Sequence, residues 1–186
     1  MKDFNIHFSD IYEIKSNVFK DDRGFFYESF NNNEFIKCTG VKVNFVQDNF
    51  SLSNFGVLRG LHYQIKPFDQ GKLVSVLQGS IIDFALDIRV TSPNFGKFYF
   101  TKLEPYKSKL WIPSGYAHGF LALDNDTKVL YKTTNYYSSE HERTIDILDS
   151  YTGIDKIIYE NIKLNQLIRS DKDVSGKNFR MSDYFD

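Results

Sequence analysis

The sequence has little of the residue types that mark several classes of protein. Cys38 is the only cysteine among 186 residues, which excludes an internal disulfide and a thiolate-rich metal site. No partner pattern surrounds Cys38, so we expect a partly buried thiol and assign it no role. Residues 1–10 have neither the apolar core of a signal peptide nor the length of a membrane span. We therefore expect a cytoplasmic protein without a membrane partner.

An excess of charge of one sign is also absent. The chain has 23 Lys and Arg residues against 24 Asp and Glu residues, and its formal net charge is −1. A nearly neutral protein has no global field that would attract it to nucleic acid or to an anionic membrane. We expect no nucleic-acid partner, and any anionic ligand must be bound by local side chains.

The sequence does contain many short strand patterns. Residues 81–89 alternate apolar side chains with aspartate and arginine, the period-two pattern of a strand with one buried face. Clusters of Gly, Pro, Asn, Asp and Ser separate similar segments. Those segments are residues 43–51, 72–79, 97–103, 109–113 and 127–134. Several short strands at this spacing predict an all-β sandwich or barrel.

Helical patterns are scarce. Residues 31–33 are a candidate N-cap for a short helix through Ile36. After Tyr151, apolar and charged residues mix without a clear period, and no linker or repeat divides the chain. One domain is the default at this length. We expect a single domain over residues 1–186, with an all-β core and short helical additions at both ends.

Four polar clusters lie within or beside the predicted strands. They are residues 23–28, 47–49, 59–64 and 113–120, and Lys72 follows the third. Charged side chains that point into a small barrel cost several kcal/mol each unless they pair or meet a ligand. The clusters therefore predict a functional site if they face inward.

Strict alternation divides the cluster at 59–64 between two faces. It places His62 and Gln64 on one face of the strand and Arg59 on the other. Taken alone, His62 is equally consistent with a hydrogen-bonded framework histidine, and Lys72 with an exposed charge at a strand edge. Their occurrence together favours a site.

A metal site has one partial signal. Pro113, Gly115 and His118 have the spacing of the second metal motif of cupin proteins. The first cupin motif uses His-x-His followed by a carboxylate, whereas this chain has His62-Tyr63-Gln64. Two imidazoles and an amide are a poor ligand set for a divalent transition metal. We therefore expect no bound metal.

The clusters, taken in order, resemble one known family. The chain is similar to the dTDP-4-dehydrorhamnose 3,5-epimerase (RmlC-like) family in the ordered segments RGFFYESF, FVQDNFS, GVLRGLHYQ, QGKLVSVLQG, DIRVTSPNFG, LWIPSGYAHGF, YKTTNYY and SDKD. The match runs from about Asp21 to Asp173. The resemblance implies a cupin-type jelly-roll β-barrel, a homodimer and no cofactor. It also implies inversion of carbons 3 and 5 of a dTDP-4-keto-6-deoxyhexose, in dTDP-rhamnose biosynthesis for surface polysaccharide such as O-antigen.

The resemblance further implies four catalytic residues. His62 matches the general base, and Tyr131 matches the tyrosine that delivers a proton from the opposite face. Lys72 matches the residue that stabilises the enolate. Asp173 matches the carboxylate that orients the histidine, and Asp171 is the alternative.

Further positions match residues that bind the substrate. Those that line the sugar and its diphosphate are Arg23, Glu28, Gln47, Asp48, Asn49, Arg59, His118, Glu142 and Lys172. Tyr137, one of a pair with Tyr136, matches the ring that stacks on the nucleobase. Arg23 and Arg59 would supply charge-assisted forks for the two phosphates.

Proton chemistry agrees with these roles. Removal of a hydrogen beside a ketone needs a base of near-neutral pKa and a cation where the enolate oxygen develops. Histidine, with a pKa of about 6.5, and a lysine ammonium suit these tasks. Tyrosine, with a pKa of about 10, suits the returning proton if the site lowers that value.

The C-terminal third departs from the family pattern. Ile147 and residues 149–150 replace a Trp and an Asp-Pro, residues 158–159 replace a Trp-Pro, and residues 157–165 contain a small insertion. We interpret these as packing positions. Three alternatives stay open: inversion of carbon 3 alone or movement of the ketone, a metal-dependent cupin oxygenase, and a non-catalytic sugar-nucleotide module. The last has no need of His62 or Tyr131.

Overall fold

The computed structural model describes residues 8–186. The N-terminal stretch interpreted above, residues 1–10, falls mostly outside that range, because residues 1–7 are not described. Within the described residues, no helix has the length and apolar character needed to cross a membrane.

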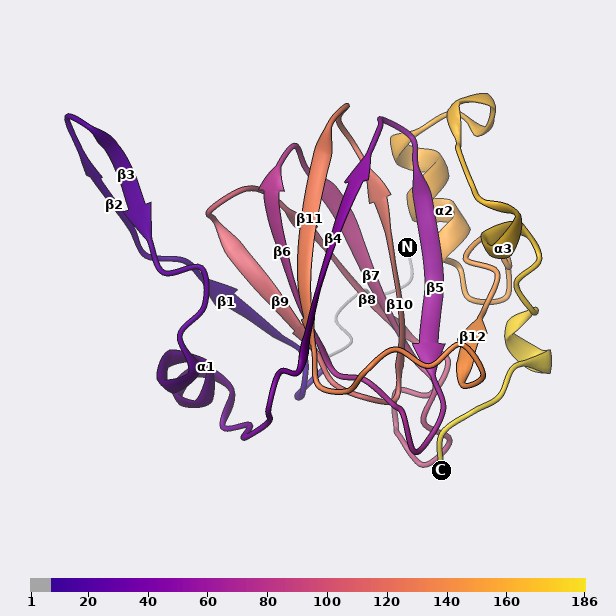
Figure 1. Cartoon of the computed structure of the whole chain (residues 1–186). Coiled ribbons are helices and arrows are strands. Elements are labelled where there is room, and N and C mark those ends of the chain that lie inside the picture. The colour runs from indigo at the N-terminus through magenta and orange to yellow at the C-terminus, as the bar shows by residue number, and fades with distance from the viewer. Residues whose placement is uncertain (1–7) are drawn as a thin grey trace.

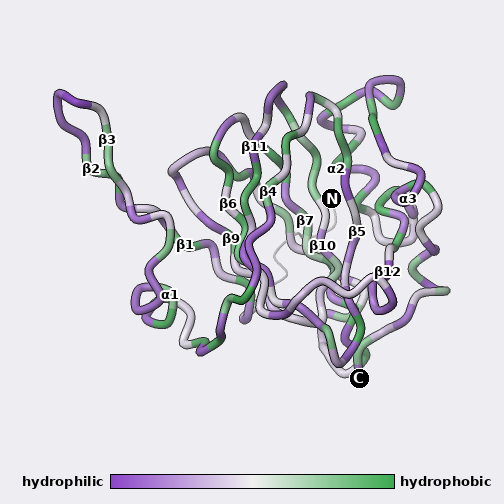
Figure 2. The backbone as a smooth tube through the Cα atoms, viewed as in Figure 1, coloured by the Kyte–Doolittle hydropathy of each residue, from purple (hydrophilic) through white to green (hydrophobic). Residues whose placement is uncertain are grey.

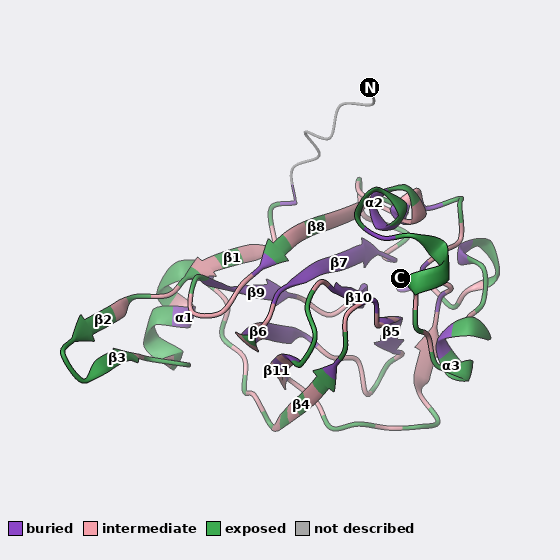
Figure 3. Ribbon diagram, turned by 90° about the horizontal axis from the view of Figure 1, so that it is seen from above, coloured by how far each residue is buried: buried purple, intermediate pink, exposed green. Residues whose placement is uncertain are grey.

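Two five-stranded antiparallel sheets form the body of the protein. The first sheet has the order β1 (Tyr12–Lys15), β9 (Ser108–Ile112), β6 (Lys72–Gln78), β11 (Thr127–Thr133) and β4 (Gln47–Ser53). The second has the order β12 (Glu142–Thr144), β5 (Leu58–Gln64), β10 (Tyr116–Ala122), β7 (Ile81–Asp87) and β8 (Phe98–Leu103). Viewed from above, the sheets lie face to face (Figure 3). The predicted all-β fold is confirmed, and every segment predicted as a strand overlaps one.

Strand β7 is buried along its whole length, whereas its sequence predicts only one buried face. Phe84 and Leu86 point into an apolar cluster that they share with helix α2 (Ile154–Asn161). Ala85 packs on the other side, in the apolar cluster between the sheets, and Asp83 is fully buried. The prediction of an exposed polar face was wrong because the second sheet is covered on both sides. Its polar face is turned inward.

A two-stranded arm projects from the body (Figure 1). The arm, residues 18–27, consists of β2 (Val18–Asp21) and β3 (Gly24–Tyr27). At its base, Phe25 and Tyr27 pack their rings against Tyr106, with centroids 4.5 and 5.1 Å apart. Its tip is hydrophilic (Figure 2).

Helix α1 (Asn32–Thr39) follows the arm, and its N-terminus confirms the predicted cap. The side chain of Asn31 accepts hydrogen bonds from the backbone amides of Asn33 and Glu34. Cys38 lies on this helix and is exposed, so the expectation of a partly buried thiol was wrong. The buried residues of this helix are Phe35 and Thr39, and Cys38 does not share their side.

The C-terminal third contains short helices that the sequence pattern does not reveal. Besides α2 they are η1 (Leu164–Gln166), α3 (Asp171–Val174) and η2 (Phe179–Met181). Elements of this length span too few turns for a hydrophobic period to be recognised. Helix α3 lies beside β5 (Figure 1), and its N-cap Ser170 accepts a hydrogen bond from the amide of Asp173. This segment brings the carboxyl group of Asp173 to β5, where it accepts a hydrogen bond from the amide of Gly60.

Candidate active site

A cavity of about 250 Å³ opens between the two sheets, and most of its lining is polar side chains from their strands. The residues predicted for a site that line it are Gln47, Asn49, Arg59, His62, Lys72, His118, Tyr131, Tyr137, Glu142 and Lys172. Three of the four polar clusters of the sequence, residues 47–49, 59–64 and 113–120, therefore contribute side chains to the cavity. A cavity of this kind, with several convergent polar groups, is the default location for a binding site.

Arg59 and His62 both line the cavity, although strict alternation predicts opposite faces. In the pairing of β5 with β10, His62 lies opposite His118 and Arg59 lies opposite Phe120. Strand β5 therefore carries one extra residue, a bulge that turns both side chains to the same side. Gly60 has a φ of 104°, and a Cβ there would lie 2.6 Å from the carbonyl oxygen of His118. Only glycine fits this position.

His62 lies against a buried carboxylate. Its Nε2 is 2.7 Å from Oδ1 of Asp173, a close contact that lies off the N–H direction of the ring. Asp173 is 4% exposed, and it also accepts hydrogen bonds from the amide of Gly60 at 3.0 Å and the hydroxyl of Ser170 at 2.6 Å. Asp171 is exposed at the first position of α3. Of the two candidate aspartates, Asp173 is the one that contacts His62.

The protonation states of this pair follow from its surroundings. Burial lowers the pKa of His62, and the contact with Asp173 only partly opposes that effect. Burial by itself raises the pKa of Asp173, but its contacts with His62, Ser170 and Gly60 outweigh burial and hold it well below the usual range. The geometry therefore favours a neutral imidazole beside an ionised carboxylate near pH 7. A neutral imidazole can accept a proton.

Lys72 is buried, with 7% of its surface exposed. Strand β6 lies between β9 and β11, so the alternative of an exposed charge at a strand edge was wrong. Its Nζ donates a hydrogen bond to the carbonyl oxygen of His62 at 3.0 Å. Burial lowers the pKa of Lys72 to about 8, although Asp83 and Glu142 oppose the shift. The ammonium is thus held in the cavity at neutral pH.

Tyr131 faces His62 from the other sheet. It lies on β11, opposite Asn49 and Val74 in the ladder, and its side chain lines the cavity. A lowered pKa was expected for a tyrosine that returns a proton, but burial raises the pKa of Tyr131, and Arg59 only partly opposes the rise. The phenol therefore remains protonated, which is the form that can donate a proton.

A second histidine lies deeper in the barrel. Nε2 of His118 is 2.7 Å from Oδ1 of Asp83, and the two residues are 6% and 0% exposed. Both lie in the second sheet, on β10 and β7. In the described range, 8–186, no group of three or more His, Cys, Asp or Glu side chains is arranged to hold a metal ion. Instead, Nε2 of each cavity histidine lies 2.7 Å from a carboxylate oxygen.

Three residues that line the cavity contact one another. The ammonium of Lys172 lies 2.5 Å from Oε1 of Glu142, and the hydroxyl of Tyr137 donates to Oε2 of the same carboxylate at 2.8 Å. The amide of Tyr137 donates to the side chain of Gln47 at 3.0 Å. Tyr137 is 56% exposed and lines the cavity, while Tyr136 does not. These contacts place an open aromatic ring at the cavity edge.

Comparison with known proteins identifies the family. The family model described as dTDP-4-dehydrorhamnose 3,5-epimerase matches residues 5–181. The chain belongs to this family. It is 46% identical to the dTDP-4-dehydrorhamnose 3,5-epimerase of Shigella flexneri over 95% of this chain and 94% of that one. It is 44% identical to that of Pseudomonas aeruginosa over 100% and 99% of the two chains.

Solved structures of the family have the same fold. The epimerase of Legionella pneumophila, solved in complex with dTDP-4-keto-L-rhamnose, superposes with a TM-score of 0.88 at 42% identity, over 96% of this chain and 93% of that one. The epimerase of Mycobacterium tuberculosis superposes with a TM-score of 0.83 at 30% identity, over 97% and 89%. The predicted cupin-type architecture is confirmed.

Two of the departures from the family pattern are packing positions, as expected, whereas Ser150 and Tyr159 are exposed. Ile147 and Ile158 are both fully buried in the apolar cluster outside the second sheet. Asp149 accepts hydrogen bonds from the amides of Tyr151 and Phe179 and so joins two turns of the C-terminal segment. None of these residues lines the cavity.

Three of the residues predicted to bind the substrate do not line the cavity. The side chain of Arg23 is 90% exposed at the tip of the arm and pairs with Asp21. Glu28 accepts a hydrogen bond from Asn31 near α1. Asp48 points to the outer face of β4, where its carboxylate lies 2.9 Å from the ammonium of Lys132.

Asp83 and Gln64 are among the residues around the site that were not predicted as site residues. Asp83 was interpreted as part of an exposed strand face. The repeated aspartates of β7, Asp83 and Asp87, could instead have indicated a polar face turned inward. Gln64 is buried, accepts a hydrogen bond from the amide of Ser138 at 2.7 Å and donates to the carbonyl oxygen of Tyr136 at 3.1 Å. It therefore fixes the loop that carries Tyr137, a long-range contact that no local pattern reveals.

Proposed function

We propose that this protein inverts carbons 3 and 5 of dTDP-4-keto-6-deoxyglucose to give dTDP-4-keto-L-rhamnose, without a metal or other cofactor. The observation that carries the proposal is the placement of His62 and Tyr131 on opposite sheets, facing one cavity. Membership of the family supports the substrate class.

In this proposal His62 is the base. Burial favours its neutral form, and Asp173 stabilises the imidazolium that forms when a proton is taken from the carbon beside the ketone. The C–H electron pair moves toward the carbonyl and gives an enolate. The ammonium of Lys72 stabilises the developing oxyanion, and such a preorganised donor in a dry site contributes much of the rate.

Tyr131 then returns a proton from the opposite face. Its phenol is protonated because burial raises its pKa, and it can still protonate the much more basic enolate carbon. Delivery from the sheet opposite His62 inverts the carbon. The same pair can serve the second carbon after the sugar ring changes conformation.

The remaining cavity residues bind the nucleotide and sugar in this proposal. Arg59 already donates to Ser53 and to the carbonyl oxygen of Leu52, so its guanidinium is held in place for a phosphate. Tyr137 presents an exposed ring on which a nucleobase can stack.

We also propose a homodimer in which the arm of one protomer reaches the cavity of its partner. Arg23 lies outside its own cavity, and the arm exposes Phe19 and Phe26 at 63% and 66%. Exposed aromatic side chains are typical of interfaces. A cytoplasmic location and a role in surface-polysaccharide synthesis are part of the same proposal.

The test is incorporation of deuterium from heavy water into dTDP-4-keto-6-deoxyglucose, followed by mass spectrometry and NMR. We expect label at carbons 3 and 5, no loss of activity with a chelator, and exchange lower by on the order of 10³-fold in His62→Ala. The matched control is His141→Ala, because His141 contacts Ser138 outside the cavity lining. Label at carbon 3 alone would indicate a single epimerase.

Two other outcomes point to other classes. Loss of exchange on chelation indicates metal-dependent chemistry. Binding of the nucleotide sugar without exchange above the His62→Ala level indicates a non-catalytic module. Light scattering of the wild type tests the dimer, and the KM of Arg23→Ala tests the contribution of the arm to the partner's cavity. A monomeric wild type together with an unchanged KM in Arg23→Ala would contradict the proposed dimer.

A further inference from the structure

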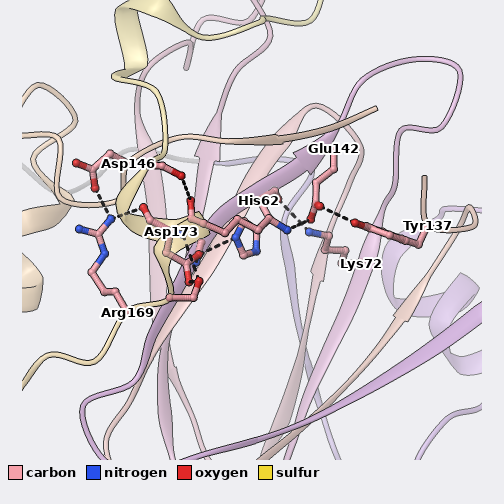
Figure 4. Close-up of polar contacts among 11 residues, drawn as sticks. His62, Lys72, Tyr137, Glu142, Asp146, Arg169 and Asp173 are labelled. Carbon is pink, nitrogen blue, oxygen red and sulfur yellow. Dashed lines mark hydrogen bonds and ion pairs between the residues drawn. The ribbon is translucent and has the colours of Figure 1, made fainter. Parts of the chain in front are cut away.

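The C-terminal segment holds the carboxylate of Asp173 in place through a residue outside the cavity. Arg169 precedes α3, and its side chain is 12% exposed. Its Nη2 donates a hydrogen bond to the carbonyl oxygen of Asp173 at 2.6 Å and contacts Oδ1 of Asp146 at 2.5 Å. Figure 4 shows the guanidinium between these two residues, on the side of Asp173 away from His62.

Asp146 is fixed to the same strand ladder as His62. It directly follows Ile145, which exchanges two backbone hydrogen bonds of 2.9 Å with Leu61, the neighbour of His62. Its own amide donates to the carbonyl oxygen of Lys177, and its Oδ1 accepts from the amide of Leu148. The carboxylate of Asp146 is thus a fixed point in the second sheet.

These contacts close a ring. The ring runs from His62 to the carboxylate of Asp173, through the backbone carbonyl of Asp173 to Arg169, then to Asp146 and back along the ladder to His62. Apart from the contact through Arg169, the described contacts that join Asp173 itself to the sheet are those of its carboxylate with the amide of Gly60 and with His62. Helix α3 has four residues, so it cannot fix its own position by internal hydrogen bonding alone.

From this geometry we infer that Arg169, held by Asp146, is a positioning residue for the proposed epimerisation: it sets the distance between Asp173 and His62. The inference rests on the proposed function. Arg169 does not line the cavity and therefore does not contact the substrate. Misplacement of a catalytic group by about 1 Å can lower a rate by about 10²-fold, so a residue outside the site can control the chemistry.

The first variant is Arg169→Met, which keeps the apolar length and removes both contacts. We expect kcat lower by roughly 10- to 100-fold with KM within about twofold of wild type. Contact with Asp173 raises the pKa of His62, so the acid limb of kcat/KM should also move to lower pH in the variant. A purely structural role would not move that limb.

Arg169→Lys is the rescue variant. Both contacts come from one nitrogen, and Nε of Arg169 has no hydrogen-bond partner within the described residues, so an ammonium can reproduce them in part. We expect activity between wild type and Arg169→Met. The matched control is Arg143→Met: Arg143 also bonds a carboxylate, Asp183, and backbone carbonyls, but not Asp173. It should keep kcat within about twofold of wild type.

Asp146→Asn weakens the contact between Arg169 and Asp146 and replaces Arg169→Met as the test if that variant does not fold.

A double variant separates positioning from general stability. In an Asp173→Asn background, Arg169→Met should cause little further loss of kcat, because both act through the same carboxylate. Multiplicative losses, or an unchanged kcat and pH limb in Arg169→Met, would overturn the inference. Absence of deuterium exchange in the wild-type protein would instead overturn the proposed function.

Discussion

Lys72 and His62 lie on strands of different sheets, and the ammonium of Lys72 donates to the carbonyl oxygen of His62 at 3.0 Å. The contact fixes the cation beside the base before any ligand binds. Because the hydrogen bond uses only one of three donors of the ammonium, the other donors remain for an oxyanion.

The first prediction is a pH profile with limbs set by these two groups. Burial lowers the pKa of His62 below its usual value, so kcat/KM should fall only when the medium is more acid than about pH 6.5. Burial lowers the pKa of Lys72 to about 8, so kcat/KM should also fall above that pH as the ammonium is lost.

Lys72→Met tests the second limb. We expect kcat lower by about 10²- to 10³-fold and no alkaline limb near pH 8, because the variant has no ammonium to lose. Lys109→Met is the matched control, since Lys109 is similarly buried and donates to the carbonyl oxygen of Glu28 outside the cavity. A Lys72→Met profile that keeps the alkaline limb would assign it to another group.

The second prediction concerns the face of proton return. In Tyr131→Phe the base is intact but the opposite donor is missing, so the enolate should be protonated from the side of His62. We expect deuterium to enter the substrate with little inversion, by NMR of the recovered sugar. Tyr99→Phe is the control, because Tyr99 is a half-buried tyrosine outside the cavity. Full inversion in Tyr131→Phe would remove Tyr131 as the donor.

The third prediction is a stability effect of Asp173. Burial raises the pKa of Asp173, but its contacts with His62 and Ser170 lower the pKa by more. The pKa of Asp173 is therefore depressed in the folded protein. A depressed pKa adds stability above the unfolded value of about 3.9, and that stability is lost as pH falls through the folded pKa. We expect Tm of the wild type to drop below about pH 4, and to drop less in Asp173→Asn.

The matched control is Asp171→Asn, since Asp171 is exposed two positions earlier on the same helix. It should follow the wild-type curve of Tm against pH. Equal acid sensitivity in all three proteins would mean that the contact between Asp173 and His62 does not stabilise the fold.

The fourth prediction tests the bulge. Gly60→Ala forces a Cβ against the carbonyl oxygen of His118 and the Cα of Gly119, both at 2.6 Å, and should lower the free energy of unfolding by roughly 1–3 kcal/mol. Gly24→Ala is the control: Gly24 also has a positive φ, but a Cβ there meets nothing within 4 Å. Similar urea midpoints for the two variants would mean that the loss of stability comes from the backbone conformation and not from the contact of the added Cβ.

The fold was predictable from the sequence because strands at regular spacing have a local signature. The site was predictable in composition, because charged side chains within the strands of a small barrel need a partner or a ligand. Its geometry was not. Nothing local in residues 59–64 reveals that a bulge brings Arg59 to the side of His62, and nothing near Asp173 reveals which strand it meets. The position of Arg23 outside the cavity depends on the path of a whole arm.

The apolar cluster between α2 and the second sheet separates the residues that stabilise the fold from those that lie near the cavity. Phe84 and Leu86 on one side of β7 pack in the cluster with α2, while Asp83 on the other side contacts His118, which lines the cavity. Substitutions that retune the reaction can therefore accumulate on the inner face of this strand while the packing on its outer face is unchanged. A barrel stabilised from outside can vary its chemistry at small cost to its architecture.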